Sequence, residues 1–370
     1  MTVQPSQWAS ARILPVSESF ERLLIVRLGS MGDIIHTLPA AIAVRQAFPD
    51  ATLGWIVEER WAELLCAAFE PRSGPRSPRR PIADKIHTVD TKQWRSSLLS
   101  LQTWERMAAA LSELRAPQYQ IAIDFQGAVR SAILARWSGA PQTCGFRQPR
   151  ENVASMLYTH QVEAVGTHIV EQNISLAEAV AGHLSGVPQV EFPCDPTAEK
   201  KMEDWLRSKD IRDFILLNPG AGWGAKQWPA QRYGEVAESL ANDGVRSLIN
   251  FGPGEEELAR TAEDASSGAA MSIKCSLAEL IALTRRARLF IGGDTGPMHL
   301  AAALNVPVIA IFGPTDPRRN GPFGTRCRVL RSGSSLTSFS HRPETDPGLL
   351  QIMAEHVVAA ARQLMGESGG

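Results

Sequence analysis

The sequence predicts an α/β protein built from two doubly wound parallel-sheet domains. Short apolar runs typical of buried strands alternate with helical patterns along the whole chain, and strands separated by helices form parallel sheets. With 370 residues, the chain is also long enough for two domains of roughly 150 residues each. The apolar runs are residues 23–26, 53–57, 121–124, 214–218, 247–251, 289–291 and 306–312.

A proline-rich segment divides these strands into two groups. Pro188, Pro193 and Pro196 lie in a stretch without helical period, which is typical of a linker. Each half also contains a strand that runs into a glycine turn with an aspartate, which indicates two related Rossmann-like domains facing each other. We therefore expect an N-terminal extension at 1–20, a first domain at 21–187, a linker at 188–198, a second domain at 199–345, and a C-terminal helix at 346–370 that is a candidate to pack back on the first domain.

Composition favours a cytoplasmic globular enzyme. A formal net charge of -1 with 21% charged residues argues against a nucleic-acid binder. The five cysteines are far apart and form no C-x-x-C pair, so we expect neither a zinc site nor disulfides. The first 20 residues lack the pattern of a signal peptide, and no apolar run reaches the roughly 18 residues of a membrane span.

Residues 71–81 form a segment rich in proline and arginine that cannot be a regular element. A solvated loop is the favoured interpretation. The alternative is a patch for anionic lipid, made by Arg72, Arg76, Arg79 and Arg80.

The most informative stretch, residues 289–303, is a strand that runs through a glycine turn straight into a helix. Such a junction presents backbone N–H groups to an anion. Thr295 or Asp294 is placed to cap the helix, and Pro297 suits its first turn. His299 follows about one turn later, within reach of what the turn holds. A phosphorylated ligand is the expected occupant.

The first strand ends in the turn Gly29-Ser30-Met31-Gly32-Asp33. It differs from the G-x-G-x-x-G turn of dinucleotide-binding folds, so a dehydrogenase is disfavoured. Asp33 lies at the carboxyl end of a strand, where it is placed to take a proton from a substrate hydroxyl. A helix cap is an equally common use of such a residue. Because Pro39 disturbs a helix begun at Asp33, a later helix capped by Thr37 is the alternative.

Two further turns in the second half suit a nucleotide. A glycine-rich loop after residues 216–218 ends in Lys226, which is placed to meet a diphosphate, although a structural turn with a surface lysine fits equally well. Glu255, Glu256 and Glu257 follow another strand, where one carboxylate suits sugar hydroxyls and the others stabilise a helix dipole. The loop is not a Walker A sequence.

Basic residues near the first group of strands suit an acidic acceptor. Arg130, with Arg95, Lys92 and Arg147, would form such a surface, the alternative being scattered solvated charges. Neither a D-x-D pair nor a His/Cys cluster is present in the sequence. We therefore expect no metal and no cofactor, with helix amides and Lys226 stabilising a diphosphate leaving group.

Taken together and in order, these motifs resemble the heptosyltransferases of glycosyltransferase family 9. The resemblance extends from about Arg22 to Gly324 and rests on an ordered set of motifs: Gly29–Asp33, Asp124–Gly127, Lys226–Pro229, Gly293–Leu300 and Gly313–Pro317.

The resemblance implies a GT-B fold and a cytoplasmic enzyme that contacts the inner membrane peripherally. It implies inverting, metal-independent transfer of heptose from ADP-L-glycero-β-D-manno-heptose to the Kdo of lipopolysaccharide, on a Kdo-lipid A acceptor. Another donor or acceptor, or a non-catalytic sugar-nucleotide-binding protein, is the alternative. The implied roles are Asp33 as base; Lys226, Glu255 (preferred over Glu256), Asp294, Thr295, Gly296 and His299 at the donor; and Ser30, Gly32, Arg95 and Arg130 at the acceptor.

Overall fold

The protein is described by a computed structural model covering residues 19–97, 100–184, 186–338 and 343–367. Most of the expected N-terminal extension, residues 1–18, lies outside this description. The chain forms two compact units, the first ending at Cys194 and the second beginning at Asp195. Within the described residues, every helix is too short or too polar to cross a bilayer.

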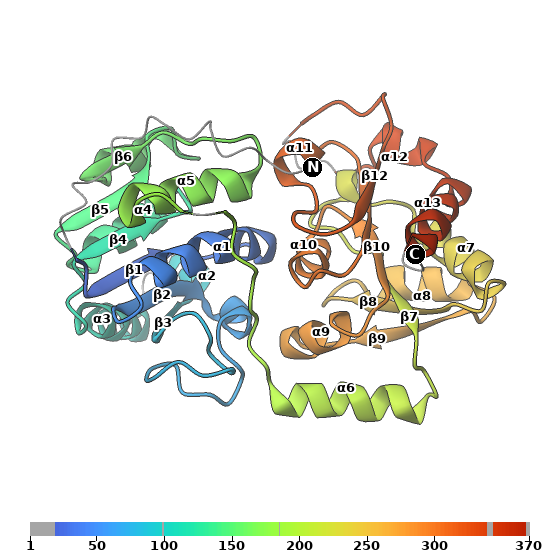
Figure 1. Ribbon diagram of the computed structural model, residues 1–370, viewed down its shortest axis with the longest axis horizontal. Coiled ribbons are helices and arrows are strands. Elements are labelled where there is room, and N and C mark those ends of the chain that lie inside the picture. The colour runs from blue at the N-terminus through green and yellow to red at the C-terminus, as the bar shows by residue number, and fades with distance from the viewer. Residues whose placement is uncertain (1–18, 98–99, 185, 339–342, 368–370) are drawn as a thin grey trace. The chain divides into compact units, whose positions relative to one another are not determined.

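The first unit is a six-stranded parallel sheet with strand order β3-β2-β1-β4-β5-β6. The strands β3, β5 and β6 were not among the runs singled out in the sequence. Helices α1 and α5 pack side by side, as Figure 1 shows. The elements are β1 (Arg22–Val26), α1 (Met31–Ala47), β2 (Thr52–Glu58), η2 (Glu59–Leu64), β3 (Lys85–Val89), α2 (Thr91–Ser96), α3 (Leu101–Arg115), β4 (Ile121–Asp124), α4 (Val129–Trp137), β5 (Gln142–Phe146), η3 (Asn152–Leu157), β6 (His160–Val162) and α5 (Ile169–Ala181).

The second unit repeats this topology in a six-stranded parallel sheet with order β12-β11-β10-β7-β8-β9. Both units thus have the strand order of a Rossmann fold, which confirms the predicted fold class. The elements are α6 (Pro196–Ser208), β7 (Phe214–Asn218), η4 (Gly224–Lys226), α7 (Ala230–Ala241), β8 (Arg246–Phe251), α8 (Glu256–Asp264), β9 (Ala270–Lys274), α9 (Leu277–Thr284), β10 (Leu289–Gly293), α10 (Gly296–Ala303), β11 (Val308–Phe312), α11 (Pro317–Asn320), β12 (Cys327–Arg331), α12 (Pro347–Gln351) and α13 (Ala354–Gly366).

The C-terminal helix completes the core of the second unit. Helix α13 packs against α7, β11 and β12. Its buried residues Val357, Ala361 and Leu364 belong to the same apolar cluster as Ile309 and Ile311 of β11. The sequence offered this helix as a candidate to pack back on the first domain, and that packing stays a prediction.

The strand order of each sheet reverses direction at the centre, between β1 and β4 in the first unit and between β7 and β10 in the second. In open α/β sheets, ligands bind beyond the carboxyl ends of the strands at this switch point. In the first unit, β1 and β4 are neighbours there, with Val26 opposite Asp124. In the second, β7 and β10 are neighbours, with Asn218 opposite Gly292. The loops that follow these four strands carry the motifs singled out in the sequence.

The segment at residues 71–81 is organised around a buried arginine, one of the four that the sequence offered as a lipid-binding patch. Arg80 is 1% exposed, and four carbonyl groups surround its guanidinium. Arg80 donates hydrogen bonds to the carbonyl oxygens of Pro71, Gly74, Pro75 and Ala83. Arg80 therefore holds the loop together and is not available to a lipid surface.

The other three arginines of this segment are exposed but paired. Arg72 forms a two-pronged ion pair with Glu59, Arg76 lies 3.9 Å from Asp84, and Arg79 lies 3.7 Å from Glu70. The acidic partners offset much of the positive charge that the sequence suggested for this loop.

Candidate functional site

Asp33 lies in the first turn of α1 and forms part of a capping box. Its Oδ2 accepts hydrogen bonds from the backbone N and the Oγ of Ser30, each at 3.0 Å. The helix begins at Met31 and continues through Pro39, so the alternative of a later helix capped by Thr37 is wrong. The Thr37 hydroxyl instead donates to the carbonyl of Asp33 at 2.9 Å.

The Asp33 carboxylate is half-buried and has a cationic partner. Its side chain is 35% exposed, and Oδ1 lies 2.7 Å from Nη2 of the buried Arg27. Partial burial favours the neutral carboxyl, but the charge of Arg27, the bonds from Ser30 and the charge of Arg150 outweigh it, so the pKa of Asp33 lies below its ordinary value. Asp33 is thus an ionised acceptor of hydrogen bonds at neutral pH, able to cap the helix and to receive a proton.

The loop after β4 holds the loop after β1 in place. The side chain of Gln126 accepts a hydrogen bond from the backbone N of Leu28 at 2.8 Å, and Arg27 donates to the carbonyl of Phe125. Asp124 is fully buried and accepts hydrogen bonds from Tyr158 and Ser131 and from the amides of Gln126 and Gly127. Burial raises the pKa of Asp124, and its bonding gives it a structural role.

A close backbone approach brings Arg150 to this loop. Gly127 has φ 65°, and a Cβ on it would come within 2.9 Å of Pro149 and 3.1 Å of the Arg150 nitrogen. Glycine alone permits this approach. Arg27 and Arg150 are the two cations that act on Asp33, and sequence reasoning missed both. The arginine at the end of the first strand was a usable signal, whereas Arg150 lies in a loop without a pattern.

The arginines expected to form an acceptor surface are dispersed in the structure. Arg130 is exposed in the first turn of α4, next to the Gly127 loop, and Arg95 is exposed on α2. Arg147 is engaged with Glu163 at 2.6 Å. Of the predicted basic residues, Arg130 lies nearest in sequence to the loop that supports Asp33.

The second unit brings three of the predicted residues into one buried cluster. Nζ of Lys226 lies 2.5 Å from Oδ2 of Asp294, and Nε2 of His299 lies 3.2 Å from Oδ1. Burial would favour a neutral Asp294, but the hydrogen bond from His299 and the charge of Lys226 outweigh it and hold the pKa of Asp294 well below its usual range. Because an ionised carboxylate only accepts, Nε2 of His299 carries the hydrogen. Nζ of Lys226 also lies 4.2 Å from the ring centroid of Trp223, a contact that the sequence did not reveal.

Helix α10 starts beside this cluster. Thr295 occupies the N-cap position and Pro297 the first turn, as the sequence predicted. The Thr295 side chain forms no cap bond, however; its Oγ1 donates to the carbonyl of Gly293 at 3.4 Å. Asp294 points its oxygens at Lys226 and His299. The expectation that either side chain caps the helix is therefore wrong, and the N–H groups of Thr295 and Gly296 lie where the positive end of the helix dipole attracts an anion.

The two neighbouring glutamates at the start of α8, Glu255 and Glu256, have different partners. Glu255 accepts a hydrogen bond from the backbone N of Gly252 at 2.7 Å, and its carboxylate lies against Gly220, where an added Cβ would come within 2.1 Å of it. Glu256 is turned to the exposed Lys274 at 2.8 Å. Only Glu255 of this pair therefore lies against the glycine-rich loop that leads to Lys226.

Comparison with known proteins decides the family. The model of glycosyltransferase family 9 (heptosyltransferase) matches residues 107–346. The chain belongs to glycosyltransferase family 9. It is similar to lipopolysaccharide heptosyltransferase 1 of Pseudomonas aeruginosa, with 30% identity over 82% of this chain and 81% of the relative. The same-named protein of Escherichia coli K12 is 28% identical over 84% of this chain and 93% of the relative.

Solved structures of family 9 proteins agree with this fold. The structure of the E. coli heptosyltransferase WaaC with ADP matches with a TM-score of 0.74 at 27% identity, covering 93% of this chain and 99% of that one. A family 9 structure from Veillonella parvula matches with a TM-score of 0.77 at 21% identity, over 94% and 97% of the two chains. The protein is thus a glycosyltransferase of the GT-B type.

Within the described residues, no group of three or more His, Cys, Asp or Glu side chains is placed to hold a metal ion. Lys226 and the start of α10 lie beside the second unit's switch point. These supply positive charge where the family resemblance implies a diphosphate.

Proposed function

We propose that this enzyme transfers heptose from ADP-L-glycero-β-D-manno-heptose to the Kdo of a lipid-anchored lipopolysaccharide precursor at the cytoplasmic face of the inner membrane. The observation that carries the proposal is the pair of switch-point sites: a half-buried, ionised Asp33 in the first unit and the Lys226–Asp294–His299 cluster in the second. Similarity to two proteins named lipopolysaccharide heptosyltransferase 1, at 28–30% identity over most of the chain, supports the donor and the acceptor.

The first unit would activate the acceptor. The Asp33 carboxylate accepts the proton of a Kdo hydroxyl as the hydroxyl oxygen attacks the anomeric carbon of heptose. A positioned general base contributes about 10²–10⁴-fold to such a step. Ser30 and Gly32 would lie against the acceptor because they form the same turn, and Arg130 and Arg95 would meet its negative charges.

The second unit would hold the donor and stabilise the leaving group. As the bond between the anomeric carbon and the phosphate oxygen breaks, both of its electrons stay with ADP. Lys226 and the amides of Thr295 and Gly296 offset the charge that develops on the diphosphate. Asp294 and His299 fix the position of Lys226, and Glu255 accepts hydrogen bonds from hydroxyl groups of the donor.

This arrangement leads to two finer proposals. Attack opposite the leaving ADP in one displacement inverts the anomeric configuration. Charge stabilisation by Lys226 and the start of α10 makes a divalent cation unnecessary. The test is an assay with ADP-heptose and a Kdo-lipid A acceptor after exhaustive chelation, with the product linkage assigned by NMR. Inverted product formed in chelator supports both proposals, whereas retention, or activity restored only by added Mg²⁺ or Mn²⁺, contradicts the respective one.

A further inference from the structure

Helix α3 carries an apolar stripe that the core of the first unit does not cover. Its core-facing side is formed by Thr103 and Leu114, which are buried. A second row, spaced at three and four residues, follows one side of the helix, since residues at this spacing share a face. The row consists of Leu101, Trp104, Ala108 and Leu111, and Arg115 continues it at the end of the helix.

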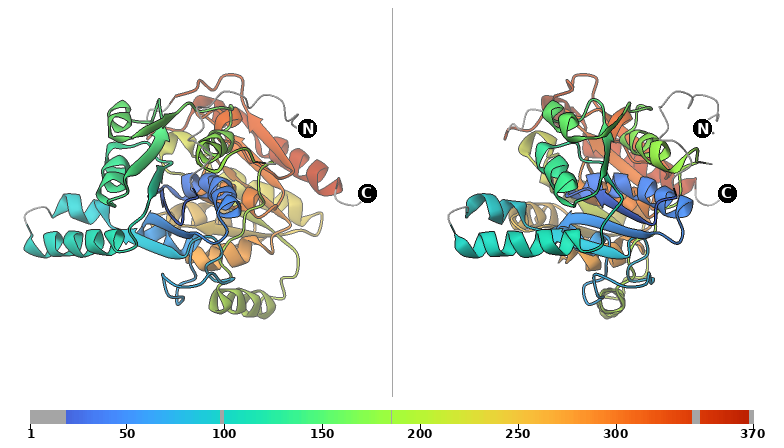
Figure 2. Two further views of the ribbon diagram at one scale, coloured as in Figure 1. Left: turned by 60° about the vertical axis from the view of Figure 1, so that its left-hand side comes forward. Right: turned by 90° about the vertical axis from the view of Figure 1, so that its left-hand side faces the viewer.

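The stripe is most exposed at its N-terminal end. Leu101 is 75% exposed and Trp104 is 54% exposed, while Leu111 is partly covered by the core. In Figure 2, α2 and α3, drawn in cyan, extend away from the first sheet as a pair of helices. Single exposed apolar residues are normal, but two large ones on one face at the end of a projecting element indicate a contact surface.

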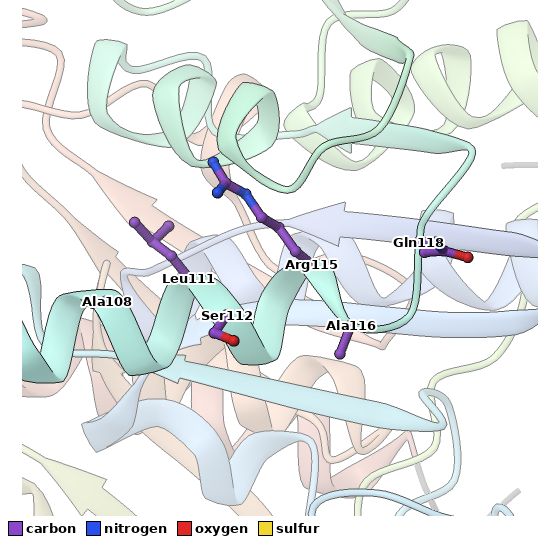
Figure 3. A pocket seen from close by; sticks show the side chains of 6 residues that line it. All are labelled: Ala108, Leu111, Ser112, Arg115, Ala116 and Gln118. Carbon is purple, nitrogen blue, oxygen red and sulfur yellow. The ribbon is translucent and has the colours of Figure 1, made fainter.

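The stripe ends in an open hollow of about 560 Å³ beside the C-terminal half of α3. Figure 3 shows Leu111 and Arg115 on one side of the helix at this hollow. The Arg115 guanidinium donates to the carbonyl of Trp137 at 2.8 Å, which holds the arginine at the end of the stripe.

Positive charge accompanies the exposed end of the stripe. Helix α2 contains Lys92 and Arg95 and no acidic residue, and both side chains are exposed. Within the described part of the chain, no ion pair includes either of them, in contrast to the paired arginines of residues 71–81. Arg106 on α3 adds a third exposed cation. Two exposed carboxylates lie on the same pair of helices: Glu105, next to Trp104, and Asp90, which caps α2 by accepting from the backbone N of Gln93. Glu113, the other acidic group of α3, faces His87 at 3.3 Å.

We propose that the α2–α3 pair is the surface by which the enzyme docks on an anionic lipid bilayer, with Leu101 and Trp104 entering the headgroup region and Lys92 meeting lipid phosphates, while Arg95 beside it meets the charges of the lipid-anchored acceptor. Tryptophan prefers this interface because its ring is apolar and its N–H is polar. Cations beside an inserted apolar face attract anionic lipid. The proposal rests on the proposed function, because a lipid-anchored acceptor places the reaction at a bilayer.

The test measures vesicle binding of the full chain. Wild type, Leu101→Ser/Trp104→Ser and Phe69→Ser are sedimented with phosphatidylcholine vesicles that contain or lack phosphatidylglycerol. Phe69 is the matched control, because it is 86% exposed and lies beside the arginine-rich loop. We expect wild type and Phe69→Ser to bind the anionic vesicles in a salt-sensitive manner. The double variant should bind at least about tenfold more weakly, since burying one such side chain alone gives about that factor.

Several results would overturn the proposal: no binding by wild type, equal binding by the double variant, or loss of binding in Phe69→Ser alone. A change in oligomeric state of the double variant, with vesicle binding intact, would assign the stripe to a protein partner. All three proteins are also assayed on a deacylated, water-soluble Kdo acceptor, where we expect equal turnover. Vesicle binding as predicted without turnover by any of them would refute the proposed function and leave the docking surface standing.

Discussion

Replacing Arg27 with methionine should move the acidic limb of the kcat/KM profile to higher pH. Asp33 acts as a base only when ionised, and the Arg27 charge 2.7 Å away keeps it ionised further into the acidic range. Such a partner lowers a carboxylate pKa by about 1–3 units. Because the Asp33 side chain is 35% exposed, solvent screens part of this effect, and we expect the acidic limb to move by less than the loss of a fully buried partner would cause.

The sign of this shift follows from the direction of the pKa change. Without Arg27, the pKa of Asp33 rises, so the base is protonated at a higher pH and the rate begins to fall earlier on acidification. The bonds from Ser30 and the charge of Arg150 remain and limit the shift. Arg27→Lys, which keeps the charge, should shift the limb less. An unchanged acidic limb in a folded, active Arg27→Met enzyme would refute the role of Asp33 as an ionising base.

Three further predictions concern donor binding and stability. Glu255→Gln should raise the KM for donor about tenfold through loss of a charge-assisted hydrogen bond, whereas Glu256→Gln, whose partner is exposed, should leave it unchanged; equal effects would contradict the assignment. Lys226→Met should weaken ADP binding by about 10–100-fold in calorimetry, and unaltered affinity would remove Lys226 from the phosphate site. Arg80→Met should lower the free energy of unfolding by about 2–4 kcal/mol in urea titrations, because buried carbonyls lose their donor, while Arg79→Met should cost less than about 1 kcal/mol; similar losses would refute the buried role of Arg80.

The sequence was most informative where physical constraints are local. Central strands such as Phe214–Asn218 and Leu289–Gly293 are continuous apolar runs because both faces of a parallel sheet are covered. The strand-to-helix turns at Asp33 and Asp294 could also be placed, because glycines and residue types common at helix starts mark them in the sequence. The apolar pattern did not predict the edge strands. His160–Val162 has only three residues and Cys327–Arg331 contains two arginines, so neither has the apolar pattern of a central strand.

Contacts between distant segments could not be predicted in this way. The Lys226–Asp294 pair joins residues 68 positions apart, and the approach of Arg150 to Asp33 depends on the backbone conformation of Gly127. Arg80 shows the same limit, because four arginines in a polar segment look alike in sequence and only the folded loop buries one of them. The preference for Glu255 over Glu256 as the donor-binding residue likewise depends on the partner of each carboxylate, which is the backbone N of Gly252 for Glu255 and Lys274 for Glu256.

The most direct test of the account is the transfer reaction itself, followed by mass spectrometry with wild type and Asp33→Asn in parallel. Each protein is incubated with ADP-heptose and a Kdo-lipid A acceptor, and ADP binding is measured separately. The account predicts addition of one heptose by wild type, at least about a hundredfold slower addition by Asp33→Asn, and equal ADP affinity. Undiminished transfer by Asp33→Asn would contradict the proposed base, and absence of transfer by wild type despite tight binding of ADP-heptose would contradict the proposed acceptor.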